Sequence, residues 1–146
     1  MLRDLKVLIV EDSPLVQKQI TLAFEDAGFD VIGKAQNGVE ALMKCKKVQP
    51  DLISIDVIMP EMHGIDLYKQ IKKLYPDIKC LFITCLRSDQ IKDAFPNEIQ
   101  PFQFLDKPTN PETLYAAVET LYETPTQETE PTNDEKSPEL PTQGAS

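Results

Sequence analysis

The sequence predicts an α/β fold in which one five-stranded parallel sheet carries helices on both faces. Short apolar runs recur at intervals of roughly 20–30 residues, and segments with helical periodicity separate them, which is the spacing of βα units. Several of these runs are apolar continuously rather than alternately, as in strands that are buried on both faces. The runs begin near Val7, Val31, Leu52, Cys80 and Phe102. We therefore predict a doubly wound (βα)5 sheet with strand order 2-1-3-4-5.

The first two helices are predicted from their end signals and their apolar faces. Ser13–Pro14 begins the first helix, because proline suits the first helical turn, and Gly28 ends it. Asn37 is the expected N-cap of a second helix over residues 39–47. The side chains expected to face inward are Val16, Ile20, Ala23, Phe24, Ala27, Ala41, Leu42 and Cys45.

Three further helices follow along the chain. One covers Ile65–Tyr75, a short one begins at Ser88 and is ended by Pro96, and the last begins at Asn110–Pro111. The inward residues are Ile65, Leu67, Tyr68, Ile71 and, in part, Leu74 in the first of these, and Leu114, Ala117, Val118 and Leu121 in the last.

Composition divides the chain into a domain over residues 1–123 and a tail over residues 124–146. The tail has four prolines, five threonines and no aromatic residue, so it buries too little apolar surface to order itself, and we expect it to be disordered. It holds five acidic residues and one lysine, so it contributes −4 to the net charge of −9. The remaining domain is also acidic, which argues against direct binding of nucleic acid.

Cysteine content and the N-terminal segment point to a cytoplasmic protein. The three cysteines are odd in number and lack metal-ligand spacing, which favours a reducing compartment over a disulfide framework. The apolar run after Asp4 has four residues, too few for a signal peptide or a membrane span, so we expect no membrane insertion.

Polar residues follow the predicted strands at the points where they end. Glu11–Asp12 follows the first strand, Asp56 the third, Thr84 the fourth and Lys107 the fifth. Parallel strands bring their carboxyl ends to one edge, where ligands of such sheets bind. Three clustered carboxylates repel one another unless a cation is present, and oxygen ligands suit Mg²⁺. We expect Asp56 to be a nucleophile for a phosphoryl group, with Lys107 and Thr84 contacting the phosphoryl oxygens.

These residues resemble a known family. Residues 10–13, Asp56 with Met59–Pro60 and Gly64, Thr84, and Lys107–Pro108 are similar, in order and spacing, to the response-regulator receiver domain of two-component signalling, including the chemotaxis type. The resemblance spans roughly residues 5–122. It implies a fold like that of CheY and flavodoxin.

The resemblance also implies roles for individual residues. Asp56 would take a phosphoryl group from a sensor histidine kinase or a phosphotransfer protein. Asp12 and Asp56 would bind Mg²⁺ directly, Glu11 through water, and Ile58 through its backbone carbonyl. Thr84 and Phe104 would relay the modification to an output protein that the sequence does not identify. Such a domain is a switch with weak autophosphorylation and autodephosphorylation, not a metabolic enzyme.

The chain departs from the family pattern on the surface that such domains use for output. Cys85 replaces a small residue, Gln100–Pro101 replaces a small pair before the fifth strand, and Pro96 shortens a helix. Two positions that flank the phosphoryl group in this family are Ile58 and Leu86 here. Neither side chain orients a water molecule or takes its proton, so we expect a long-lived acyl phosphate.

Other interpretations use the same residues. A phosphatase of the haloacid-dehalogenase type needs a second Asp two residues after the nucleophile, where this chain has Ile58. A scaffold that works without phosphorylation, or a receiver cut from a longer regulator, stays open. His63, the only histidine, is interpreted as an exposed loop residue. Gly28 to Lys34 is not a nucleotide-binding loop, because Ala35 replaces the required hydroxyl residue.

Overall fold

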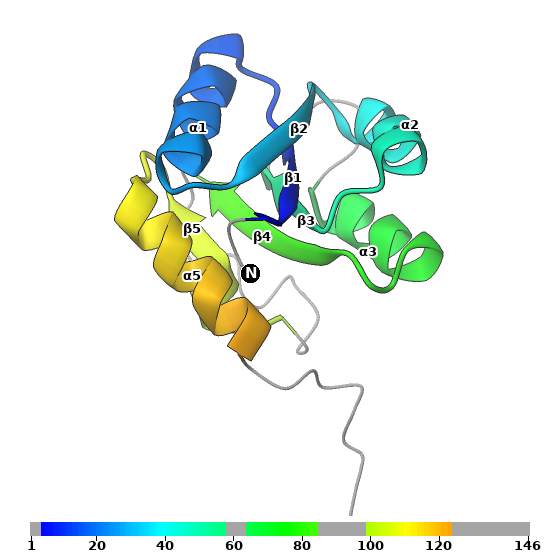
Figure 1. Cartoon of the computed structure of the whole chain (residues 1–146). Helices are drawn as coiled ribbons and strands as arrows, with labels where there is room; N and C mark the ends of the chain where they lie inside the picture. Colours follow the sequence, from blue (N-terminus) through cyan, green and yellow to red (C-terminus); the bar gives the residue numbers. More distant parts are fainter. Residues whose placement is uncertain (1–3, 58–63, 85–98, 124–146) are drawn as a thin grey trace, which may run out of the picture.

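The computed structural model describes residues 4–57, 64–84 and 99–123, which form a three-layer α/β domain (Figure 1). The short helix predicted between Ser88 and Pro96 and the tail over residues 124–146 lie outside the described residues. Within the described part, every helix is too short or too polar to cross a bilayer.

A parallel five-stranded sheet forms the middle layer. Its strands are β1 (Lys6–Val10), β2 (Asp30–Ala35), β3 (Leu52–Ile55), β4 (Lys79–Thr84) and β5 (Phe104–Asp106). They lie in the order β2-β1-β3-β4-β5, and every neighbouring pair is parallel. The predicted fold and strand order are confirmed. The last strand starts later than the apolar run at Phe102, because the short 3-10 helix η3 (Pro101–Gln103) precedes it.

Helices cover both faces of the sheet. The described helices are α1 (Pro14–Asp26), α2 (Gly38–Val48), α3 (Gly64–Leu74) and α5 (Pro111–Glu123). In Figure 1, α1 and α5 lie side by side on one face, and α2 and α3 lie on the other. Because each of these helices runs back from the carboxyl end of a strand, the loops that begin them gather at one edge of the sheet.

The predicted helix ends are confirmed by hydrogen bonds. The Asn37 side chain accepts a hydrogen bond from the backbone N–H of Glu40 at 2.8 Å, and the Asn110 side chain accepts one from Thr113 at 2.8 Å. Ser13 caps α1 through a longer contact of 3.4 Å to the N–H of Val16. Gly28 follows α1 with a φ of 98°, a conformation that glycine adopts without strain.

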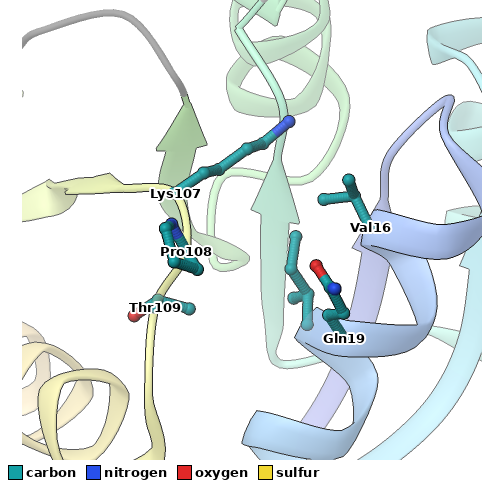
Figure 2. A pocket seen from close by; sticks show the side chains of 6 residues that line it. Val16, Gln19, Lys107, Pro108 and Thr109 are labelled. Carbon is teal, nitrogen blue, oxygen red and sulfur yellow. The ribbon is translucent and has the colours of Figure 1, made fainter.

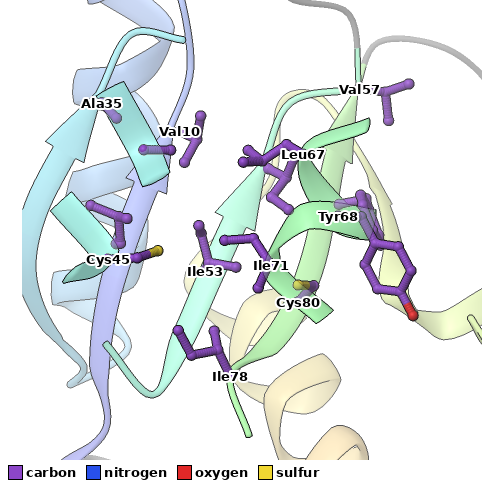
Figure 3. Packing of buried hydrophobic residues seen from close by; sticks show 14 of the residues in the cluster. Val10, Ala35, Cys45, Ile53, Val57, Leu67, Tyr68, Ile71, Ile78 and Cys80 are labelled. Atoms are coloured by element: carbon purple, nitrogen blue, oxygen red, sulfur yellow. The ribbon is translucent and has the colours of Figure 1, made fainter. Parts of the chain in front are cut away.

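Two hydrophobic clusters fill the space on either side of the sheet. One packs α1 and α5 against the sheet, and the other packs α2 and α3 against its opposite face (Figure 3). The inward faces of the helices are confirmed with one exception. Leu74 was expected to be partly buried, but it is 53% exposed. It is the last residue of α3, and the next residue, Tyr75, packs against the core in its place.

Two cysteines belong to the cluster under α2 and α3. Cys45 and Cys80 are buried free thiols, and burial raises the pKa of Cys45 to about 11 and that of Cys80 to about 12. These groups therefore remain protonated at neutral pH and act as small apolar side chains. The expected inward position of Cys45 is confirmed, and Cys85 lies outside the described residues.

Candidate functional site

The backbone of the sheet holds the predicted site residues in register at its carboxyl edge. Val10 and Ile55 are the last paired residues of β1 and β3, and directly after them the N–H of Asp56 donates to the carbonyl of Val10 at 3.0 Å. The N–H of Glu11 donates to the carbonyl of Ala35 at 2.9 Å, and that of Lys107 to the carbonyl of Thr84 at 3.0 Å. The hydrogen-bond ladders thus continue beyond the strands and fix where these side chains begin.

Three carboxylates meet at this edge. One oxygen atom from each of Glu11, Asp12 and Asp56 lies within 4.8 Å of the other two. Glu11 is 1% and Asp56 is 5% exposed, whereas Asp12 faces solvent. The expected convergence of the three acids is therefore observed, with one acid open to the outside.

Lys107 joins the acids from the end of β5. Its Nζ lies 2.7 Å from Oε1 of Glu11 and 3.4 Å from Oδ2 of Asp56. Burial alone would lower the pKa of Lys107, but the hydrogen bond to Glu11 and the charges of Asp56 and Glu11 outweigh it, so its pKa is raised. The side chain is consequently an ammonium ion at neutral pH and offers a positive charge beside Asp56.

The residues present fit a divalent cation. Three formal negative charges and the single Lys107 ammonium leave −2 in a site where two of the acids are buried. Buried charge of this kind is costly without a counter-ion, and an all-oxygen ligand set suits Mg²⁺. The family resemblance also implies the backbone carbonyl of Ile58 as a ligand, but Ile58 lies outside the described residues.

Thr84 is the last residue of β4, and Phe104 is the first residue of β5. Thr84 is 1% exposed at the end of its strand. The Phe104 ring stacks on Phe82 with centroids 5.2 Å apart, and Phe82 in turn contacts Tyr68 of α3 at 5.7 Å. Phe104 is therefore an inward-facing member of a row of three aromatic rings, in which Phe82 and Phe104 are stacked and Tyr68 is tilted against Phe82. Its role as a relay stays a prediction.

Gly64 allows α3 to begin directly against the loop that carries Asp56. Its N–H donates to the carbonyl of Val57 at 2.8 Å. A Cβ atom at this position would lie 2.6 Å from the carbonyl oxygen of Asp56 and 2.8 Å from Cα of Val57. Only glycine permits this approach of two backbone segments.

A pocket of about 500 Å³ opens beside Lys107, between α1 and the segment that follows β5 (Figure 2). Its walls are partly apolar, and the Lys107–Pro108 peptide bond on its rim is cis. The residues that line it are Val16, Gln19, Ile20, Lys107, Pro108 and Thr109.

Sequence reasoning missed Gln17, which supports the site, and Gln103, which joins the segment before β5 to the start of β4. The Gln17 side chain contacts the backbone of Glu11, and the Gln103 side chain donates to the carbonyl of Cys80 at 3.0 Å and accepts from the N–H of Gln100 at 2.8 Å. The sequence itself indicates the roles of these two glutamines only weakly. Gln17 lies next to the inward residue Val16, and Gln103 interrupts an apolar run before β5.

The family model described as the response regulator receiver domain matches residues 7–119. The chain belongs to this family. The receiver domain is 41% identical over 58 residues to a chemotaxis protein CheY from Listeria monocytogenes, which is 40% of this chain and 49% of that protein. It is 45% identical over 58 residues to a protein-glutamate methylesterase/protein-glutamine glutaminase from Archaeoglobus fulgidus, 40% of this chain and 17% of that protein. The matches thus span less than half of the length of these curated relatives.

Solved structures resemble this receiver domain over most of its length. A chain of the CheX–CheY–BeF3–Mg complex from Borrelia burgdorferi superimposes with a TM-score of 0.68 at 28% identity, covering 81% of this chain and 89% of that chain. The chemotaxis protein CheY4 from Vibrio cholerae gives a TM-score of 0.66 at 31% identity, covering 80% and 97%. These similarities support the same fold and a role in two-component signalling.

Proposed function

We propose that this receiver domain accepts a phosphoryl group on Asp56 from a sensor histidine kinase or a phosphotransfer protein and signals by binding a partner in the phosphorylated state. The observation that best supports this proposal is the chemical environment of Asp56. It is a buried carboxylate with the Lys107 ammonium 3.4 Å away and two further acids beside it.

The proposed step is a transfer from nitrogen to oxygen. An oxygen of the Asp56 carboxylate attacks phosphorus, the phosphorus–nitrogen bond of the donor phosphohistidine breaks, and the imidazole leaves as it takes up a proton. Lys107, released from part of its pairing with Asp56, neutralises one phosphoryl oxygen, and the Thr84 hydroxyl donates a hydrogen bond to another.

Glu11, Asp12 and Asp56 would hold Mg²⁺ in this reaction, with the Ile58 carbonyl as the further ligand that the family resemblance implies. When bound, the cation supplies positive charge to the transferred phosphoryl group. The CheY structure from Borrelia burgdorferi, a complex with CheX, BeF3 and Mg, supports both the metal and a protein partner. A scaffold that needs no phosphorylation, and a receiver that is part of a longer regulator, remain the alternatives.

The test is phosphorylation with Mg²⁺ and acetyl phosphate, followed by intact-protein mass spectrometry. The wild-type protein should gain one phosphoryl group, and Asp56→Asn should gain none while keeping its fold, since the amide has the same shape. Asp26→Asn, which changes an exposed carboxylate at the far end of α1, is the matched control and should be labelled normally. Undiminished labelling of Asp56→Asn would refute the assignment.

A further inference from the structure

The Gln17 side chain connects the acidic loop to the neighbouring strand. Its Nε2 donates to the carbonyl of Glu11 at 3.1 Å and to the carbonyl of Ala35, the last residue of β2, at 3.2 Å. Both partners are carbonyl oxygens, so only the NH₂ end of the glutamine amide fits between them. One amide group therefore ties the turn after β1 to the end of β2.

The position of Gln17 on α1 is itself restrained. It lies on the second turn of the helix, and helical side chains lean toward the N-terminus, which directs this amide onto the loop that precedes the helix. On the same residue, the backbone carbonyl accepts a hydrogen bond of 2.7 Å from the hydroxyl of Thr21, which is 5% exposed. The amide is thus presented from a helical turn that is anchored in the core.

Asp12 is the acid of the cluster whose side chain is least restrained by the described residues. Within the described part of the chain, the Asp12 side chain makes no hydrogen bond or ion pair, and it is exposed. Its carboxylate is nevertheless part of the acid cluster, and it follows directly on the restrained backbone of Glu11. Glu11 is held by backbone and side-chain interactions: its N–H donates to Ala35, its carbonyl accepts from Gln17, and its carboxylate accepts from the N–H of Ser13 at 3.2 Å and pairs with Lys107 at 2.7 Å.

We propose that Gln17 is a positioning residue for the cation site: its amide fixes the Glu11–Asp12 turn so that the Asp12 carboxylate is preorganised to bind Mg²⁺. This inference rests on the proposed function. Residues that orient the ligands of a metal commonly change its affinity by about tenfold or more when they are replaced. Among the described residues, the Gln17 amide contacts backbone carbonyls and no carboxylate of the site, so it would act on the backbone that carries Glu11 and Asp12.

Gln17→Met tests the proposal, because methionine keeps the length and helix propensity of glutamine but donates no hydrogen bond. Gln70→Met is the matched control, since Gln70 is exposed on α3. Titration with MgCl₂ followed by NMR chemical shifts, without a phosphoryl donor, should show about tenfold weaker binding for Gln17→Met and unchanged binding for Gln70→Met. In phosphorylation by acetyl phosphate, the half-saturating Mg²⁺ concentration should rise equally, with the rate at saturating Mg²⁺ within about twofold of wild type.

Melting with Mg²⁺ and with EDTA separates a positioning role from a purely structural one. If Gln17 positions the site, the increase in Tm caused by a fixed Mg²⁺ concentration should shrink in Gln17→Met. An equal fall in Tm under both conditions, with Mg²⁺ affinity unchanged, would overturn the proposal. If Gln17→Met does not fold, Gln17→Asn, one methylene too short to reach both carbonyls, gives the same readouts. Wild-type protein that binds no Mg²⁺ would instead contradict the proposed function.

Discussion

At the scale of single residues, the site depends on the balance of charge around Glu11. This carboxylate is 1% exposed, and the Lys107 ammonium at 2.7 Å is its closest counter-charge in the described structure. A buried charge that loses its partner is more costly than the pair itself is favourable. Lys107 is therefore expected to contribute to stability as well as to phosphoryl transfer.

Replacing Lys107 by methionine should destabilise the protein by about 3 kcal/mol at pH 7, because Glu11 would be left without a nearby cation. The raised pKa of Lys107 sets the pH dependence. Its contribution is fully present below the unfolded value of about 10.5 and is lost as the pH rises through the higher folded value. Urea unfolding of the wild type and of Lys107→Met should give a difference in the free energy of unfolding that is constant from pH 7 to 10. This difference should narrow only above pH 10. A difference that already disappears by pH 9 would contradict the assignment.

We also expect two single residues, Ile58 and Leu86, to set the lifetime of the phosphorylated state. Both lie outside the described residues, so this prediction rests on the sequence and the family resemblance. Because neither side chain orients an attacking water, the acyl phosphate should persist. Removal of the phosphoryl group should then need a phosphatase or transfer of the group back to the kinase. Ile58→Asn combined with Leu86→Glu should shorten its lifetime in Mg²⁺. Loss of label within seconds from the wild type, at a rate that the double substitution leaves unchanged, would refute this idea.

At the scale of elements, the site depends on how closely α3 approaches the end of β3. The hydrogen bond from Gly64 to Val57 and the absence of a Cβ atom let the helix start against the Asp56 backbone. A row of three aromatic rings, Tyr68 on α3, Phe82 on β4 and Phe104 on β5, joins the same helix to the last strand. A movement of α3 would therefore disturb both the backbone beside Asp56 and the ring of Phe104.

Gly64→Ala should therefore destabilise the protein by about 1–3 kcal/mol and slow phosphorylation of Asp56, because the added methyl group must push apart two backbone segments. Chemical denaturation and the rate of labelling by acetyl phosphate measure the two effects. Gly33→Ala is a useful comparison, since its new Cβ would meet only the side chain of Leu8, at 3.2 Å. If the Gly64 variant matched wild type in both measurements, the close approach would not matter for the site.

At the scale of the whole molecule, stability resides in the sheet and in the two clusters that cover it. The tail over residues 124–146 has only Leu140 and Ala145 as apolar side chains. It offers almost nothing to bury, and its charge of −4 has the same sign as that of the domain.

Deleting residues 124–146 should leave the melting temperature within about 1–2 °C of the full chain, because no apolar core is lost. Differential scanning calorimetry of both forms, with and without Mg²⁺, provides the measurement. A fall of several degrees would show that the tail docks on the domain.

The sequence by itself predicted the fold and the group of polar residues, Asp56 among them, that meets at one edge of the sheet. Continuous apolar runs at βα spacing required a parallel sheet, and a parallel sheet brings Glu11, Asp56 and Lys107 to one edge whatever the details of packing. Periodicity of this kind is local, so it is visible in the order of residues alone.

Tertiary structure alone decided which groups restrain that edge. The double contact of Gln17, the approach of Gly64 to Asp56 and the inward stacking of Phe104 join residues that are distant in sequence or depend on one rotamer. A glutamine, a glycine or a phenylalanine has the same local propensity whether or not such a partner faces it. These roles follow from the packing of elements against one another, which no local pattern specifies.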